Sequence, residues 1–197
     1  MLSGLDFASS SLVQSKALVE SMISQKDHLN SLAKWVADLV VRQHSTVLIC
    51  GNGGLAAEAS HFAGELVGRY KYNRPAFPAI ALHDPSVTTC AGNDYGFDRT
   101  FSRQVEAFGK PNDLLIGMST SGLSQNVCVA IKAAKEKGLH TLALTGQNGG
   151  GLLGLAEREW LVQSWITARI QEAHLFLLHL ICEYVDELSM AIVPVCD

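Results

Sequence analysis

The chain has 197 residues, of which 48% are hydrophobic and 17% charged, and its formal net charge is −4. This composition is that of a compact globular protein with a core large enough to need no disulfide or structural metal, and it excludes an intrinsically disordered chain. The acidic balance, without any basic run, argues against a nucleic-acid-binding surface.

Nothing in the sequence predicts export or a membrane span. The first ten residues, MLSGLDFASS, lack the basic and apolar regions of a signal peptide, and the longest apolar block near the C-terminus, LFLLHLIC, is far shorter than the roughly 20 residues that cross a bilayer. We therefore expect a cytoplasmic protein that makes no membrane contact. The cysteines form no CxxC pair, so we expect small buried side chains in a reducing compartment at Cys50, Cys90, Cys128, Cys182 and Cys196.

Residues 11–43 contain apolar side chains spaced by three, four and seven, with no proline or glycine. This pattern predicts one long amphipathic helix. A helix of this kind ahead of an α/β domain often packs on a partner subunit, so we expect an oligomer. The alternative is an extra layer over the chain's own sheet.

Five short apolar runs follow, separated by helix-like stretches at 55–69 and 125–137 and followed by a last helix at 167–190. Apolar runs that alternate with helices are typical of a parallel sheet covered on both faces. We predict a single α/β domain, residues 1–197, with a three-layer, doubly wound, five-stranded parallel sheet. The predicted strands are 46–50, 78–83, 113–118, 141–146 and 160–164.

Two loops of this fold are candidate ligand sites, because ligands of doubly wound sheets bind beyond the carboxyl ends of the strands. One is GNGG at 51–54 and the other is STSGLS at 119–124. Hydroxyls and the free N–H groups of a helix N-terminus hold phosphate without a lysine, although helix capping and turn formation explain the same residues equally well. Neither loop matches a Walker A or dinucleotide motif, so a small phosphorylated metabolite is a better candidate than a nucleotide.

The candidate acid–base and metal-ligating residues lie on two helices. His61 and Glu65 are four residues apart on one helical face, where such a pair also arises often by chance. The surrounding alanines favour close packing and an enclosed pair. The last helix adds Gln171, Glu172, His174 and His179, and helical periodicity alone does not choose among them.

Six motifs together resemble the phosphoheptose isomerases of the SIS domain family, in order and over about residues 30–185. They are GNGGLAAEASHFAGELVGRY, RPAFPAIAL, AGNDYGFDRTFSRQVEAFG, DLLIGMSTSGLSQNV, LTGQNGG and TARIQEAH. The resemblance implies conversion of sedoheptulose 7-phosphate to D-glycero-D-manno-heptose 7-phosphate through an enediol, the first step toward heptose for lipopolysaccharide or capsule. It also implies a homotetramer with active sites at subunit boundaries and the N-terminal helices in a central bundle.

Carried over by position, the resemblance implies a set of site residues. The metal ligands would be His61, Glu65, Gln171 and His179, with one zinc ion per subunit. The substrate contacts would be Asn52, Gly53, Gly54, Glu65, Asn93, Asp94, Ser119, Thr120, Ser121, Ser124 and Gln171. Glu65 would be the base at carbon and His179 would move protons between the oxygens, although a carboxylate bound tightly to zinc is a poorer base.

Two leucines depart from the family pattern. Leu55 replaces the serine usual after GNGG, and Leu123 replaces the asparagine usual in the second loop. A lost hydrogen bond to a charged group is worth roughly 1.5–3 kcal/mol, so we expect Leu55 to weaken phosphate binding and Leu55→Ser to lower KM. The alternatives to the main interpretation are an isomerase for a different sugar phosphate and a non-catalytic SIS relative of the replication-initiator-associated type, which lacks the acidic and histidine pair that this chain keeps.

Overall fold

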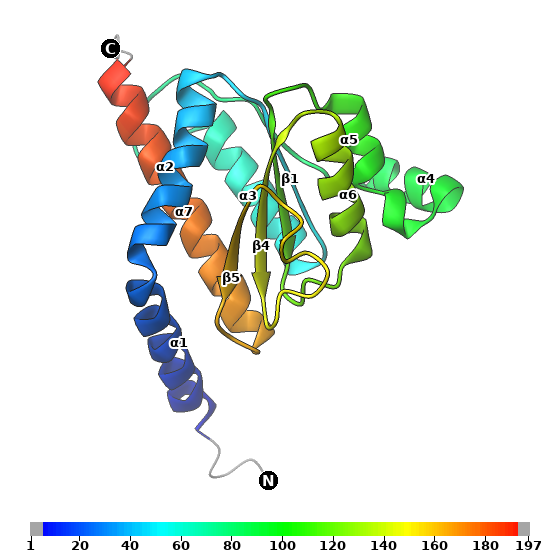
Figure 1. The fold of residues 1–197 in the computed structure, drawn as a ribbon. Helices are drawn as coiled ribbons and strands as arrows, with labels where there is room; N and C mark the ends of the chain where they lie inside the picture. Colours follow the sequence, from blue (N-terminus) through cyan, green and yellow to red (C-terminus); the bar gives the residue numbers. More distant parts are fainter. Residues whose placement is uncertain (1–5, 193–197) are drawn as a thin grey trace.

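The structure is a computed structural model, and it describes residues 6–192. Figure 1 shows a central sheet with helices on both faces and an N-terminal helix that extends away from the body. In chain order the elements are α1 Phe7–Ser24, α2 Lys26–Arg42, β1 Val47–Gly51, α3 Gly54–Val67, β2 Ala79–Ala81, α4 Pro85–Tyr95, the 3-10 helix η1 Phe97–Arg99, α5 Ser102–Phe108, β3 Leu114–Ser119, α6 Gln125–Glu136, β4 His140–Gly146, β5 Arg158–Val162 and α7 Thr167–Ile192.

The sheet has five parallel strands in the order β2-β1-β3-β4-β5. This confirms the predicted three-layer parallel fold, and each strand end lies within two residues of its prediction. The switch in strand order lies between β1 and β3, whose register pairs Gly51 with Met118 at the carboxyl edge. The loops that follow these two strands are therefore neighbours.

The two faces of the sheet bury different cores, because successive side chains of a strand point to opposite faces. Val47 and Ile49 of β1 lie in a core with α2, α3 and α7, whereas Leu48 and Cys50 lie in a core with α5 and α6. Burial on both sides explains why these strands are apolar throughout. It also places α3 and α7, which carry the ionisable candidates, on the same face.

The N-terminal prediction of one helix over 11–43 was wrong, since α1 and α2 are separate. The chain bends at Gln25, with φ −105° and ψ 10°. The Gln25 side chain accepts a hydrogen bond from Trp160 Nε1 at 3.1 Å, so a contact with β5 holds the bend. Such a tertiary contact leaves no signal in helical periodicity.

The helices α4, η1 and α5, between β2 and β3, were not predicted. The sequence did carry a signal for the first of them, because Asp84 caps α4 by accepting from the Val87 N–H at 3.0 Å and Pro85 begins the helix.

Cys50, Cys128 and Cys182 are buried free thiols as predicted, Cys90 is exposed on α4 and contradicts its prediction, and Cys196 lies outside the described residues. Within residues 6–192 no helix has both the length and the apolar character to cross a membrane.

Candidate active site

The site begins where α3 and α7 meet at the carboxyl edge of the sheet. Gly54 opens α3, and a Cβ at this position would lie 2.4 Å from Gln171 Nε2 on α7. The Gln171 side chain therefore lies directly against the backbone of Gly54 and would have to move if this position carried a Cβ. Gly53, which precedes it, has φ 60°, a conformation that other residues rarely adopt.

Three ionisable side chains gather farther along the same two helices. His61 Nε2 of α3 lies 2.8 Å from His179 Nε2 of α7, and 3.7 Å from Glu65 Oε1 one turn later. The His61 side chain is 45% exposed and the Glu65 side chain 22%, so in the single chain only the glutamate is substantially enclosed. An imidazole pair beside a carboxylate is suited to proton transfer and to metal ligation.

The His179 imidazole is held by its surroundings. The Tyr70 ring stacks on it, with centroids 5.6 Å apart and an interplanar angle of 26°. Burial lowers the pKa of His179 and the neighbouring His61 lowers it further, against an opposing effect of Glu65. A neutral His179 at neutral pH follows, and a neutral imidazole both accepts and donates a proton.

The structure separates the two histidines that periodicity left unresolved. His174 is fully buried, its Nε2 lies 3.2 Å from the Thr145 carbonyl oxygen, and burial lowers its pKa to about 4. It is a core residue on the sheet side of α7. His179, on the α3 side, is the histidine that reaches the candidate centre.

The predicted phosphate loop closes on itself after β3. The Ser119 hydroxyl donates to Ser124 Oγ at 2.9 Å, and the Ser121 hydroxyl accepts from Leu123 N–H at 3.2 Å. Gly122 has φ 68°, and a Cβ there would lie 1.8 Å from the Gly149 carbonyl oxygen. The loop is therefore packed against the loop after β4 and stands beside the N-terminus of α6. There the N–H groups of Val127 and Cys128 bond the Ser124 carbonyl oxygen, and those of the two residues before them have no acceptor within the helix.

One residue of this region was not singled out from the sequence. Asn126, in the first turn of α6, exchanges two hydrogen bonds of 2.9 Å with Asn52 of the GNGG loop. The sequence signal was weak, because an asparagine two residues after Ser124 is also an ordinary helix-start residue.

Known proteins of one family resemble this chain over most of its length. The SIS domain family model matches residues 12–146. A phosphoheptose isomerase of Citrifermentans bemidjiense is 48% identical, over 88% of this chain and 92% of that protein, and one of Vibrio cholerae is 45% identical, over 92% and 97%. The solved phosphoheptose isomerase of Neisseria gonorrhoeae is 38% identical and aligns with a TM-score of 0.84, over 91% of this chain and 97% of that chain.

The chain belongs to the phosphoheptose isomerases of the SIS domain family. It is thus a sugar-phosphate isomerase, and the resemblance drawn from its motifs is confirmed.

Two predicted substrate contacts of this phosphoheptose isomerase lie apart from its α3–α7 centre. Asn93 and Asp94 are exposed on α4, where Asn93 Nδ2 donates to Asp94 Oδ1 at 2.8 Å. Figure 1 shows α4 projecting at the opposite side of the molecule from α7. Within one chain the fold does not bring these residues to His61 and His179.

The two leucines that depart from the family pattern differ in their surroundings. Leu55 is only 4% exposed and belongs to the core between α3 and the sheet, whereas Leu123 is 71% exposed on the phosphate loop. The expectation that Leu55 stands in for a hydroxyl at the phosphate is not supported, because its side chain packs into the protein. Leu123 is the departure that faces the solvent side of the loop.

The side chains of His61, Glu65 and His179 are of the types that bind zinc. Imidazole nitrogen and carboxylate oxygen are ordinary zinc ligands. Two nitrogens on one tetrahedral zinc stand about 3.3 Å apart, given bonds of about 2.0–2.1 Å, so the His61 and His179 nitrogens at 2.8 Å need separate by only about 0.5 Å. Among the described residues, however, no group of three or more His, Cys, Asp or Glu side chains is gathered tightly enough to hold a metal as it stands.

Proposed function

We propose that the protein converts sedoheptulose 7-phosphate to D-glycero-D-manno-heptose 7-phosphate in the cytoplasm, supplying heptose for surface glycans such as lipopolysaccharide or capsule. The observation that carries the proposal is the meeting of His61, Glu65 and His179 on α3 and α7, the two helices that begin at the sheet edge bearing the serine-rich loop. A sugar phosphate needs both: acid–base groups at its carbonyl end and hydrogen-bond donors at its phosphate. Family membership supports the same assignment.

Isomerisation requires one proton to leave the carbon beside the carbonyl and one to return to its neighbour. In this proposal Glu65 removes the proton from the carbon beside the carbonyl, producing the enediol, and returns it to the neighbouring carbon. His179, kept neutral by burial and by His61, moves the proton between the two oxygens. The Tyr70 ring stacked on His179 limits its rotation and thereby orients the imidazole.

Zinc is the proposed metal, with His61, Glu65 and His179 as ligands. Gln171 is the fourth ligand in this scheme, and its side chain would have to turn from Gly54, seven residues before His61, toward the two histidines. When bound, zinc would stabilise negative charge that develops on the substrate oxygens. His61 belongs to the ligand set alone in this scheme, whereas Glu65 and His179 bind zinc loosely and leave it during proton transfer, because a group bound tightly to zinc is a poorer base. Gln171 stands beside Gly54 at the start of α3, close enough to touch the GNGG loop.

The phosphate is assigned to the loop at 119–124. Ser119, Thr120, Ser121 and Ser124 supply hydroxyls, and the N-terminus of α6 supplies backbone N–H groups and a favourable dipole. The backbone of Gly53 and Gly54 and the amide of Asn52 line the sugar between this loop and the acid–base pair. No lysine or arginine is needed.

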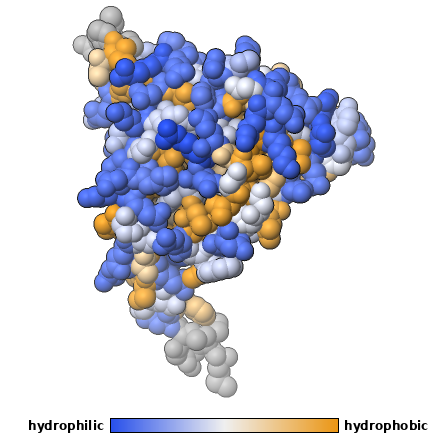
Figure 2. Space-filling view, in the orientation of Figure 1, coloured by the Kyte–Doolittle hydropathy of each residue, from blue (hydrophilic) through white to orange (hydrophobic). Residues whose placement is uncertain are grey.

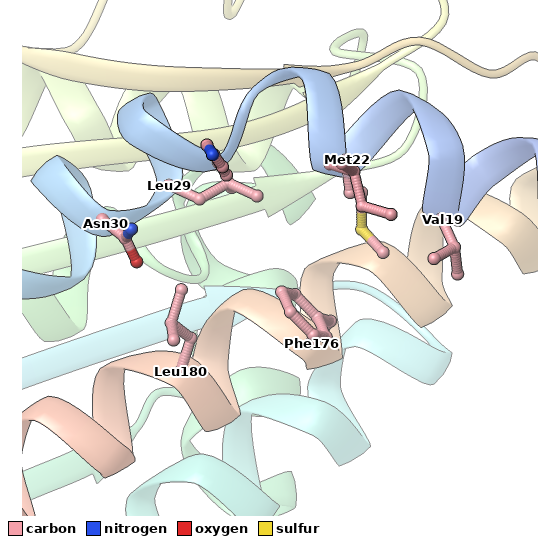
Figure 3. A pocket seen from close by; sticks show the side chains of 8 residues that line it. Val19, Met22, Leu29, Asn30, Phe176 and Leu180 are labelled. Carbon is pink, nitrogen blue, oxygen red and sulfur yellow. The ribbon is translucent and has the colours of Figure 1, made fainter.

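A homotetramer with sites at subunit boundaries is the proposed assembly. Helix α1 carries exposed apolar side chains at Phe7, Leu12, Val13, Val19 and Ile23, and Figure 2 shows such residues on the arm that projects from the body. Between α1, α2 and α7 lies an apolar groove of about 330 Å³, in which Val19, Met22 and Leu29 face Phe176 and Leu180 (Figure 3).

The distant position of α4 also supports this assembly. If Asn93 and Asp94 contact substrate, they complete the site of a neighbouring subunit rather than their own. The exposure of His61 in the single chain fits the same arrangement, since a neighbouring subunit would cover it.

The deciding experiment is incubation of the purified protein, metal-free and zinc-loaded, with sedoheptulose 7-phosphate, followed by NMR. We expect an aldose product and exchange of the substrate C1 proton with solvent. Glu65→Gln and His179→Gln should each abolish that exchange while leaving the assembly intact. Absence of turnover by the zinc-loaded protein contradicts the proposal, and failure of the metal-free protein to take up one zinc per chain in equilibrium dialysis contradicts the metal assignment.

An isomerase for a different sugar phosphate is the second candidate, and the exposed Leu123 on the phosphate loop favours it. The same NMR assay with shorter ketose phosphates distinguishes the two. Faster turnover of a shorter ketose would favour the second candidate.

A further inference from the structure

The two loops that flank the sugar-phosphate site are tied together by a single pair of side chains. Asn52 Nδ2 donates to Asn126 Oδ1, and Asn126 Nδ2 donates back to Asn52 Oδ1, both at 2.9 Å. The residues are 74 positions apart in the sequence. One stands in the loop after β1 and the other in the first turn of α6.

Because Asn126 is buried, losing the hydrogen bonds of this pair would be costly. Asn126 is 1% exposed, and its Oδ1 also accepts from the Val127 N–H at 3.0 Å. A buried amide without its partners is costly, so the arrangement in which both amides are satisfied is strongly preferred. The remaining amide hydrogen of Asn52 stays available to a ligand.

The pair joins the two helix N-termini that would receive an anion. Gly53, next to Asn52, is the residue that precedes α3, and Ser124, two residues before Asn126, is the one that precedes α6. Their strands are neighbours, with Gly51 paired to Met118. Because each helix start offers unpaired N–H groups, the separation of the two starts sets the width of the anion cradle.

We propose that Asn126 is a positioning residue for the phosphate: through Asn52 it fixes the GNGG loop against the start of α6, so that the donors of both loops converge on one anion. This deepens the proposed function and rests on its anion site. It also gives Asn52 a second task besides substrate contact. The acid–base residues on α3 and α7 are outside the pair, so its loss should affect binding more than chemistry.

A double-mutant cycle with inorganic phosphate as the probe tests the inference. Calorimetry should show phosphate bound about tenfold more weakly by Asn126→Ala, because the Asn52 amide loses its partner. Asn52→Ala should weaken phosphate at least as much, and the double variant should bind no more weakly than Asn52→Ala alone. With sedoheptulose 7-phosphate, KM should rise to the same extent while kcat stays within about threefold.

Asn73→Ala, at an exposed asparagine outside the site, is the matched control and should bind phosphate as the unaltered chain does. If Asn126→Ala is not recovered folded, Asn126→Ser replaces it, since serine keeps an oxygen near Val127 N–H but does not reach Asn52. Unaltered phosphate affinity in the folded Asn126 variant overturns the inference, as does a double variant weakened by the product of the two single effects. An unaltered protein that binds phosphate but leaves sedoheptulose 7-phosphate unchanged contradicts the proposed function alone, and the cycle is still decided by phosphate affinity.

Discussion

At the scale of single residues, Leu55 shows how a position can be assigned correctly and still be misinterpreted. The sequence identifies it as a departure from the family serine, immediately after a loop that faces a ligand. The structure turns its side chain into the core, where it is 4% exposed. The direction of a side chain in the first turn of a helix depends on how that helix packs against the sheet. The motif does not specify this packing.

We therefore expect Leu55→Ser to lower stability instead of improving substrate binding. Removing most of a buried leucine costs about 2–5 kcal/mol, and a buried hydroxyl adds to that loss unless it finds a partner. Urea unfolding at fixed protein concentration measures the change. Leu123→Ser is the control, because that side chain is 71% exposed and its replacement should change stability by no more than about 0.5 kcal/mol. A stable Leu55→Ser protein with a lower KM would restore the original interpretation.

At the scale of elements, the register of α3 against α7 is set by a buried network that the sequence does not reveal. Arg74 Nε donates to Asp186 Oδ1 at 2.9 Å, and both side chains are almost completely buried. The same guanidinium donates to the carbonyl oxygens of Leu66 and Glu65, at 2.8 and 2.7 Å. Asp186 Oδ2 accepts from the Lys71 backbone N–H at 2.8 Å. The network thus fixes the end of α3, with Glu65, to the helix that carries His179.

Breaking this network by removing one partner should be strongly destabilising. Arg74→Met leaves the Asp186 carboxylate buried without its counter-ion, and we expect a loss of about 3–5 kcal/mol in urea unfolding at fixed protein concentration. Arg74→Met combined with Asp186→Leu should recover part of that loss, since no unpaired charge remains. The control is Lys71→Met, which removes an exposed ion pair with Glu183 and should cost less than about 1 kcal/mol. A change of that small size for Arg74→Met would show that the network does not fix the helices.

The sequence predicted the elements better than their contacts. Apolar runs and glycine-rich turns predicted five parallel strands and the edge where ligands bind, because those features depend on local pattern and on rules common to all such sheets. Periodicity failed where a distant residue matters: Trp160 donates a hydrogen bond to Gln25 at the bend between α1 and α2, and the docking of α7 selects His179 over His174. The contact of Asn126 with Asn52 could not be predicted for the same reason, since the two residues are 74 positions apart.

At the scale of the whole molecule, the single chain exposes an apolar stripe on α1, and its predicted substrate contacts on α4 lie far from α7. The proposed tetramer would account for both observations. Leu12, Val19 and Ile23 lie within about 40° of one another around α1 and are 70%, 46% and 61% exposed. Only Leu18 and Met22 of this helix are buried against the chain itself. A stripe of this kind on a projecting helix is suited to pack on another copy, and in the proposed tetramer the predicted contacts on α4 would belong to a neighbouring site.

Charges on this stripe should therefore disrupt both assembly and catalysis. We expect Leu12→Glu with Ile23→Glu to convert the proposed tetramer into smaller species in sedimentation velocity, because two glutamates per chain would be buried without partners at its interfaces. Turnover of sedoheptulose 7-phosphate should fall with the tetramer, since Asn93 and Asp94 would no longer reach a neighbouring His61 and His179. Ser10→Glu, about 160° around α1 from Leu12, is the control and should leave both unchanged. A doubly substituted protein that remains tetrameric would place the interface elsewhere, and one that dissociates yet keeps full turnover would show that each chain holds a complete site.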